Sequence, residues 1–195
     1  MKLIFPHIPK TGGRSLYVLF KRKYGKRCRH ITIGENNLRL PDEIILSTDF
    51  ECYYGHFNLH RLPGCAYVIV LRHPVDRLVS YYKFLTDKKL VTGSFRNYLK
   101  TMDTDIRNGA ACRIQSVRPH NVDLKTCINI LDTAEFVSVT EHLGDLAKAL
   151  DLPGPIPRLN KSESDFVPTQ EDIDFVLSMN EVDLALYQKA SEKSI

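Results

Sequence analysis

The sequence lacks the features that mark several large classes of protein. No apolar stretch reaches the ~18 residues that a membrane span requires, and the N-terminal MKLIFPHIPK meets Pro and Lys too soon for a signal peptide. No C-x-x-C pair occurs among the five cysteines, which are Cys28, Cys52, Cys65, Cys112 and Cys127. This odd, scattered set argues against a disulfide framework or a zinc site. Asp and Glu show no clustered ligand spacing, so we expect no metal, and we expect a cytoplasmic location.

The composition suits a globular protein with an unevenly spread charge. The chain has 195 residues, 43% hydrophobic and 26% charged, which predicts a single domain over residues 1–195. Residues 1–77 hold 13 Lys and Arg against 6 Asp and Glu, a charge of +7, while residues 78–195 hold 14 against 17, a charge of −3. The basic half therefore suits an anionic ligand.

The apolar pattern alternates between strands and helices. β-Branched and apolar runs predict strands at 2–7, 51–55, 66–71 and 135–139, with a weaker one at 30–33. Helical spacing appears at 14–24, 75–86, 94–102, 121–131, 141–150, 169–178 and 180–191. The segment 94–131 is mainly helical and suits a side wall, and 151–168 has the composition of a loop. We therefore expect an α/β fold with a mostly parallel sheet flanked by helices.

The loop after the first predicted strand has the composition of an anion cradle. In KLIFPHIPKTGGRSLYVLF, Gly12 and Gly13 permit conformations closed to other residues and a close approach of backbone to ligand. The helix that follows presents its N–H groups and the positive end of its dipole. Lys10 adds a charge, and Thr11 and Ser15 add hydroxyl donors. A phosphate or sulfate group would fit here.

The order of residues in this loop argues against a Walker A motif. That motif places Lys after its second glycine, whereas Lys10 precedes Gly12 and Gly13 and no glycine comes earlier. The plainer alternative is a Gly-Gly turn beside a surface lysine.

A second basic element lies in AYVIVLRHPVDRLVSYYKFL, residues 66 to 85. A buried strand ends at Arg72, and Pro74 stands at a plausible first helical position. Ser80 falls beside the apolar stripe of that helix, so it need not be buried. Arg72 and Ser80 could hold another phosphate, although an arginine at this position is more often a structural ion-pair partner.

The two segments together resemble the sulfotransferases that use 3′-phosphoadenosine 5′-phosphosulfate (PAPS). The likeness is to the carbohydrate O-sulfotransferases related to heparan sulfate 2-O- and 6-O-sulfotransferases. HIPKTGGRSL resembles their 5′-phosphosulfate loop, in which Thr is common at the position of Arg14. VIVLRHPVDRLVSYY resembles their 3′-phosphate element, LR[DH]P-x-x-R-x-x-S-x-Y. The likeness covers most of the chain, although the chain is short for the family and lacks the transmembrane anchor of the Golgi enzymes.

The resemblance implies a P-loop-like nucleotide-binding architecture, PAPS as donor, 3′-phosphoadenosine 5′-phosphate (PAP) as product and an acceptor hydroxyl on a saccharide. Its donor-binding residues would be Lys10, Thr11, Gly12, Gly13, Arg14, Ser15, Arg72 and Ser80, with Lys10 also catalytic.

The resemblance also implies a catalytic base. YYGHFNLHRLPG is similar to a segment whose histidine is taken to be that base, which maps to His56, with His60 and Glu51 as alternatives. NGAACRIQSV departs from the usual N-x-x-T-R-x-L form, which leaves Arg113 as a candidate contact for substrate or cofactor.

Two other classes of function stay open at the level of sequence. One is an atypical P-loop phosphotransferase, which would need ATP, Mg²⁺ and a carboxylate to hold the metal. The other is a nucleotide- or nucleic-acid-binding module without turnover, whose affinity would fall steeply with salt.

Overall fold

A computed structural model of the chain describes residues 1–32, 49–56, 63–101, 106–159, 162 and 164–194. The strands are β1 (Lys2–Pro6), β2 (Cys28–Thr32), β3 (Cys52–His56), β4 (Cys65–Leu71) and β5 (Phe136–Val139). The helices are α1 (Gly13–Tyr24), α3 (Pro74–Asp87), α4 (Phe95–Thr101), α5 (Gly109–Gln115), α6 (Leu124–Thr133), α7 (Leu143–Ala149), α8 (Gln170–Met179) and α9 (Glu181–Lys193). Short 3₁₀ turns occur at Gly25–Arg27, Pro119–Asn121 and Thr140–His142. None of these described helices is long and apolar enough to cross a membrane.

The five strands form one parallel sheet in the order β2-β3-β1-β4-β5. This confirms the α/β prediction. β1 lies in the middle, between β3 and β4. Chain connections therefore leave β1 and β4 toward different parts of the sheet, and such a switch opens a crevice at the carboxyl ends of the strands.

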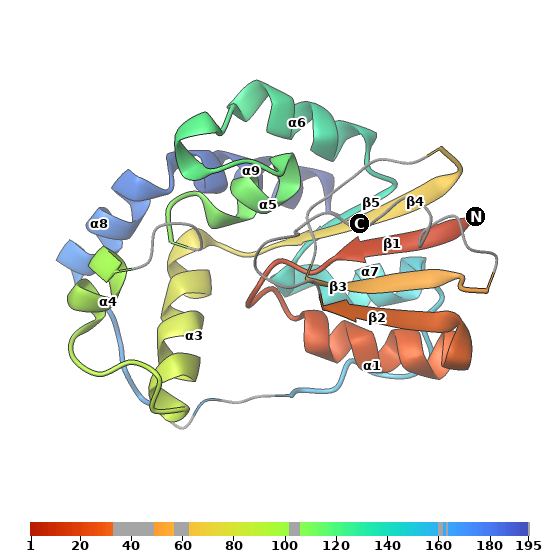
Figure 1. Cartoon of the computed structure of the whole chain (residues 1–195), viewed down its shortest axis with the longest axis horizontal. Coiled ribbons are helices and arrows are strands. Elements are labelled where there is room, and N and C mark those ends of the chain that lie inside the picture. The colour runs from red at the N-terminus through yellow and green to blue at the C-terminus, as the bar shows by residue number, and fades with distance from the viewer. Residues whose placement is uncertain (33–48, 57–62, 102–105, 160–161, 163, 195) are drawn as a thin grey trace.

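Alternating side chains along the strands build a core on each face of the sheet. On β1, Leu3 and Phe5 pack with α1 and α7, whereas Ile4 faces the opposite core with α5, α6 and α9. Figure 1 shows α5, α6 and α9 above the sheet and α1 below it. The two layers of helices fix the strands, and with them the loops at the strand ends.

A third cluster lies beyond the carboxyl ends of the strands. It joins α3, α4 and α8 through buried residues such as Leu78, Tyr98 and Val176. Figure 1 shows these three helices to the left of the sheet. They form a wall opposite the strand ends, with α3 nearest the sheet (Figure 1).

The predicted elements are found with shifted boundaries. The strand expected at 30–33 is β2, which begins at Cys28, and the helix expected at 121–131 is α6, which begins at Leu124 after a 3₁₀ turn. Asp123 accounts for the later start of α6, because its carboxylate accepts a hydrogen bond from the backbone N–H of Thr126 and so caps the helix. The described part of 151–168 contains no helix or strand, as expected of a loop.

Candidate functional site

A cavity of about 470 Å³ lies at the carboxyl ends of the strands. Its lining comes from the β1–α1 loop, the end of β3, the turn after β4, and helices α3 and α5. Residues far apart in the sequence meet here, and the predicted site residues among them are Lys10, Gly12, Gly13, Arg14, Ser15, His56, Arg72, Ser80 and Arg113.

The β1–α1 loop takes the shape that its glycines permit. Gly12 has a φ of 79° and precedes Gly13, the first residue of α1. A Cβ at Gly13 would overlap the imidazole of His7, so only glycine lets this ring lie against the helix start. Lys10 also adopts a left-handed φ of 70°, an uncommon conformation for a residue other than glycine. Gly12 and Gly13, at the N-terminus of α1, both line the cavity, so the backbone N–H groups of the helix start lie at its surface.

Thr11 has a different place from the one that the sequence suggested. Its side chain is fully buried and its hydroxyl donates a hydrogen bond to the carbonyl of Ile8 at 2.8 Å. It does not belong to the cavity lining. The hydroxyl of Thr11 therefore holds the loop in shape and leaves contact with a ligand to the loop backbone and to Ser15.

Arg72 joins the two basic elements. Its Nη1 donates a hydrogen bond to the carbonyl of Lys10 at 3.2 Å, so the turn after β4 supports the loop after β1. The ammonium of Lys10 lies 4.4 Å from the ring centre of Phe84 on α3, within cation–π range. These contacts fix two cations at the crevice predicted by the strand order.

The site concentrates positive charge in partly dry surroundings. Burial, followed by repulsion from Arg72 and Arg14, lowers the pKa of Lys10. Burial likewise lowers the pKa of Arg72, opposed by Asp76 and Glu141. Asp87 opposes the shift of Lys10, but no Asp or Glu lines the cavity in the described part of the chain, so these carboxylates act from outside it. A dianionic ligand would relieve both the repulsion and the desolvation.

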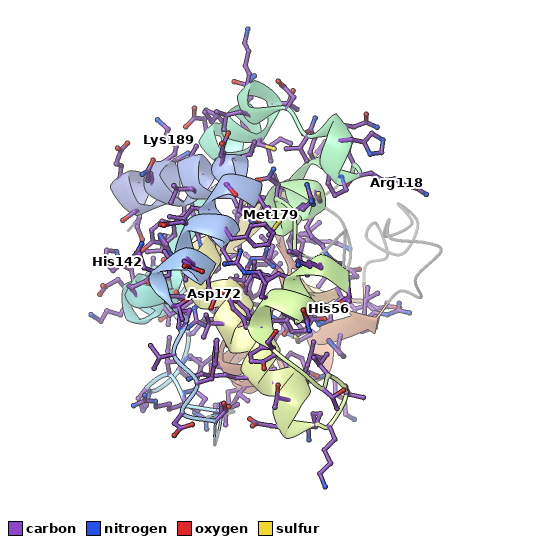
Figure 2. The ribbon with its side chains drawn as sticks, turned by 90° about the vertical axis from the view of Figure 1, so that its left-hand side faces the viewer. His56, Arg118, His142, Asp172, Met179 and Lys189 are labelled. Atoms are coloured by element: carbon purple, nitrogen blue, oxygen red, sulfur yellow. The ribbon has the colours of Figure 1, made fainter. Side chains whose placement is uncertain are left out.

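His56 stands at the end of β3 with one ring nitrogen already engaged. Its Nδ1 lies 3.1 Å from the backbone carbonyl of His7, and because a carbonyl only accepts, Nδ1 is the donor. The lone pair of the neutral ring is therefore on Nε2. Figure 2, viewed onto the strand ends, shows His56 near the centre of this face and His142 at its left edge.

The preceding glycine explains how His56 reaches this position. Gly55 has a φ of 154°, and a Cβ there would overlap the carbonyl oxygen of Ile31 on β2. Gly55 thus lets β3 pack closely against β2, and His56, the next residue, lines the cavity.

Of the two alternative bases, Glu51 and His60, only Glu51 belongs to the described part of the chain. Glu51 precedes β3 at the opposite end of the strand, where it forms an ion pair with Arg27. His56 follows Glu51 by five positions along an extended strand, roughly 16 Å along the sheet. Glu51 is therefore remote from the cavity. His60 lies outside the described residues.

A buried polar cluster supports helix α5, which carries Arg113. Arg77 belongs to the motif LR[DH]P-x-x-R-x-x-S-x-Y, whereas no pattern in the sequence predicts its partner, Asp183. Arg77 and Asp183 are almost fully buried and form an ion pair, with Nη2 and Oδ2 3.4 Å apart. The Asp183 carboxylate also accepts hydrogen bonds from the N–H groups of Ala110 (3.0 Å) and Ala111 (2.8 Å), in the first turn of α5. The cluster ties α3, α5 and α9 together, so Arg77 supports the site from outside the cavity.

Two comparisons with known proteins agree with this geometry. The sequence profile of the Sulfotransferase family matches residues 1–148. Among solved structures, the chain is similar to a sulfotransferase from Alicyclobacillus acidocaldarius, with 14% identity and a TM-score of 0.55 over 100% of this chain and 97% of that one. A comparison with curated protein sequences finds no match. The structural likeness shows the fold, and the family match covers more than half of the chain. The chain therefore belongs to the Sulfotransferase family, a membership that supports sulfuryl transfer as its general reaction.

Proposed function

We propose that the protein is a PAPS-dependent sulfotransferase that transfers the sulfuryl group to an acceptor hydroxyl, with His56 as general base. One observation carries the proposal. A single cavity contains the open N-terminus of α1 with Lys10, the Arg72–Ser80 element, and a histidine whose lone pair lies on Nε2. The donor has anionic groups at its 5′ and 3′ ends, and the cavity volume is within the range of ligand sites, ~300–1,000 Å³.

The residues divide the binding of the donor between them. The backbone N–H groups of Gly12, Gly13 and Arg14, with the hydroxyl of Ser15 and the side chains of Lys10 and Arg14, would hold the 5′-phosphosulfate. Arg72 and Ser80 would hold the 3′-phosphate. The hydrogen bond from Arg72 to the carbonyl of Lys10 links the two binding elements and supports their action on one nucleotide.

In the reaction, the acceptor oxygen forms a bond to sulfur while the bond from sulfur to the bridging phosphate oxygen breaks. Nε2 of His56 takes the proton of the acceptor hydroxyl, and PAP leaves. Lys10 and the N–H groups of α1 stabilise the charge that develops on the departing phosphate. Such chemistry depends on positioning and charge stabilisation more than on covalent catalysis.

For the acceptor we propose a saccharide hydroxyl. Besides the cationic loop and Phe84, whose ring lies against Lys10, the lining contains Tyr81, Arg113 and Leu159. Aromatic faces pack against apolar faces of small ligands, and an arginine fork binds oxygen-rich groups. The resemblance to carbohydrate O-sulfotransferases supports the same class.

Ligand-dependent melting tests the donor. PAP should raise the melting temperature of the protein, because a ligand that binds the native state stabilises it, whereas ATP with Mg²⁺ and AMP should have little effect. Stabilisation by ATP with Mg²⁺ and none by PAP would favour a phosphotransferase and refute the proposal. Transfer of label from [³⁵S]PAPS to saccharides, compared with phenols and lipids, then tests the acceptor class.

A further inference from the structure

His7 occupies the centre of the site, yet the proposed reaction leaves its side chain without a role. It follows β1, lines the cavity and is only 7% exposed. Its backbone is engaged on both sides, since its N–H donates to the carbonyl of Gly55 at 2.7 Å and its carbonyl accepts from His56 Nδ1. The centres of the His7 and His56 imidazole rings lie 4.6 Å apart. The ring of His7 is thus held in a fixed position beside the candidate base.

The hydroxyl of Tyr54 determines which nitrogen of His7 carries the proton. Tyr54 is 3% exposed, and its Oη lies 3.1 Å from His7 Nδ1. In the described part of the chain, Nδ1 is the hydrogen-bond partner found for this hydroxyl. If Nδ1 were the donor, the buried O–H would lack an acceptor, which is costly. Tyr54 therefore donates to Nδ1, and the proton of the neutral ring is on Nε2.

Two shifts in pKa keep both members of this pair neutral. Burial, together with repulsion from His56 and Arg113, lowers the pKa of His7 well below its usual value. Burial raises the pKa of Tyr54. Near pH 7 the pair is therefore a phenol that donates and an imidazole that accepts at Nδ1.

The protonated nitrogen lies at the anion cradle. The Cδ2–Nε2 edge of His7 faces Gly13, where any Cβ would overlap it, so this edge lies against the first residue of α1. Within the described residues, no hydrogen bond to Nε2 is found. The Nε2–H group of His7 thus lies next to the backbone N–H groups proposed to bind the 5′ end of the nucleotide.

We propose that His7 is a neutral hydrogen-bond donor to the 5′ anionic group of the donor nucleotide, through Nε2–H, with Tyr54 fixing its tautomer. This inference rests on the proposed function. It assigns His7 to the cradle and separates its role from that of His56, since one ring offers a proton at Nε2 and the other a lone pair.

The tautomer can be observed in the wild-type protein. Long-range ¹H–¹⁵N NMR spectra distinguish a protonated Nε2 from a protonated Nδ1 in a neutral imidazole. We expect His7 to carry its proton on Nε2, and Tyr54→Phe to release it into a mixture of tautomers. A proton on Nδ1 of His7 in the wild type would overturn the inference.

Two nucleotides that differ in the 5′ group distinguish direct contact by His7 from a merely structural role. The double variant His7→Phe/Tyr54→Phe removes both hydrogen-bonding partners together, which avoids a stranded buried hydroxyl. It should bind PAP roughly 10- to 100-fold more weakly, the loss expected for a hydrogen bond to a charged group. Binding of adenosine 3′-monophosphate, which lacks the 5′ group, should stay unchanged. His7→Gln, whose amide can donate near the Nε2 position, should restore much of the PAP affinity.

The outcomes distinguish this inference from the proposal beneath it. If wild-type protein binds PAP and the double variant loses affinity for both nucleotides equally, or for neither, the role of His7 is refuted and the proposed function stands. If wild-type protein fails to bind PAP, both are refuted.

Discussion

Replacing Asp183 by Asn should destabilise the protein strongly, because the change removes the carboxylate charge that pairs with the buried guanidinium of Arg77. The side chains of Arg77 and Asp183 are 1% and 2% exposed, and the charged atoms lie 3.4 Å apart. At an effective dielectric constant of ~20, that separation gives an attraction of about 5 kcal/mol. Removing one partner of such a pair costs about 3–5 kcal/mol, a large share of the ~5–15 kcal/mol that stabilises a typical domain.

A double-mutant cycle measured by urea unfolding tests this reasoning. Arg77→Met alone should also be strongly destabilising, whereas Arg77→Met/Asp183→Asn should cost less than the sum of the two, with a coupling of about 2–3 kcal/mol. Asp145→Asn is a matched control, because its pair with Lys148 is exposed, with side-chain exposures of 54% and 81%, and exposed pairs contribute little to stability. A coupling near zero, or an Asp183 variant as stable as the Asp145 variant, would refute the role of the buried pair.

Other predictions concern the site itself. Lys10→Ala should weaken PAP binding by about 10- to 100-fold, as measured by calorimetry, because a charged hydrogen-bond donor is lost. The pKa of Lys10 is lowered, so its side chain should lose its proton, and PAP affinity should fall, at a less alkaline pH than for an ordinary lysine. Lys10→Arg should remove that fall. A wild-type affinity that does not change with pH would contradict the assignment of Lys10. His56→Ala should reduce kcat by ~10²–10⁴-fold with PAP affinity retained, and undiminished turnover would point to another base. Gly55→Ala should lower the melting temperature, because a Cβ overlaps the carbonyl of Ile31; Gly144→Ala, where a Cβ meets open space, is the control, and equal effects would count against the strand-contact argument.

The sheet and the cavity could be predicted because their signals are local. The short, β-branched run AYVIVL favours a buried strand, which the structure places at Cys65–Leu71. Pro74 marks a helix start that the structure places at the same residue. The anion cradle follows from glycines between a strand and a helix. Such features depend on neighbours in the sequence, so the sequence is enough to identify them.

The supporting contacts could not be predicted because they depend on tertiary structure. Arg77 and Asp183 are separated by 106 positions, and nothing in the helical pattern around Asp183 indicates a buried carboxylate. The short helix α5 lies between two left-handed residues, Asn108 and Ser116. Seven residues carry too little periodicity to identify such a helix. The hydrogen bond from the Thr11 hydroxyl to the carbonyl of Ile8 likewise depends on how the loop folds back on itself.

The central claim is that one nucleotide reaches both basic elements at once. A crystal structure of the protein with PAP measures this directly. The account predicts the 5′-phosphate at the backbone of Gly12 to Arg14 with Lys10, and the 3′-phosphate at Arg72 and Ser80. A bound nucleotide that touches neither element, or that leaves the α1 N-terminus to solvent, would contradict it.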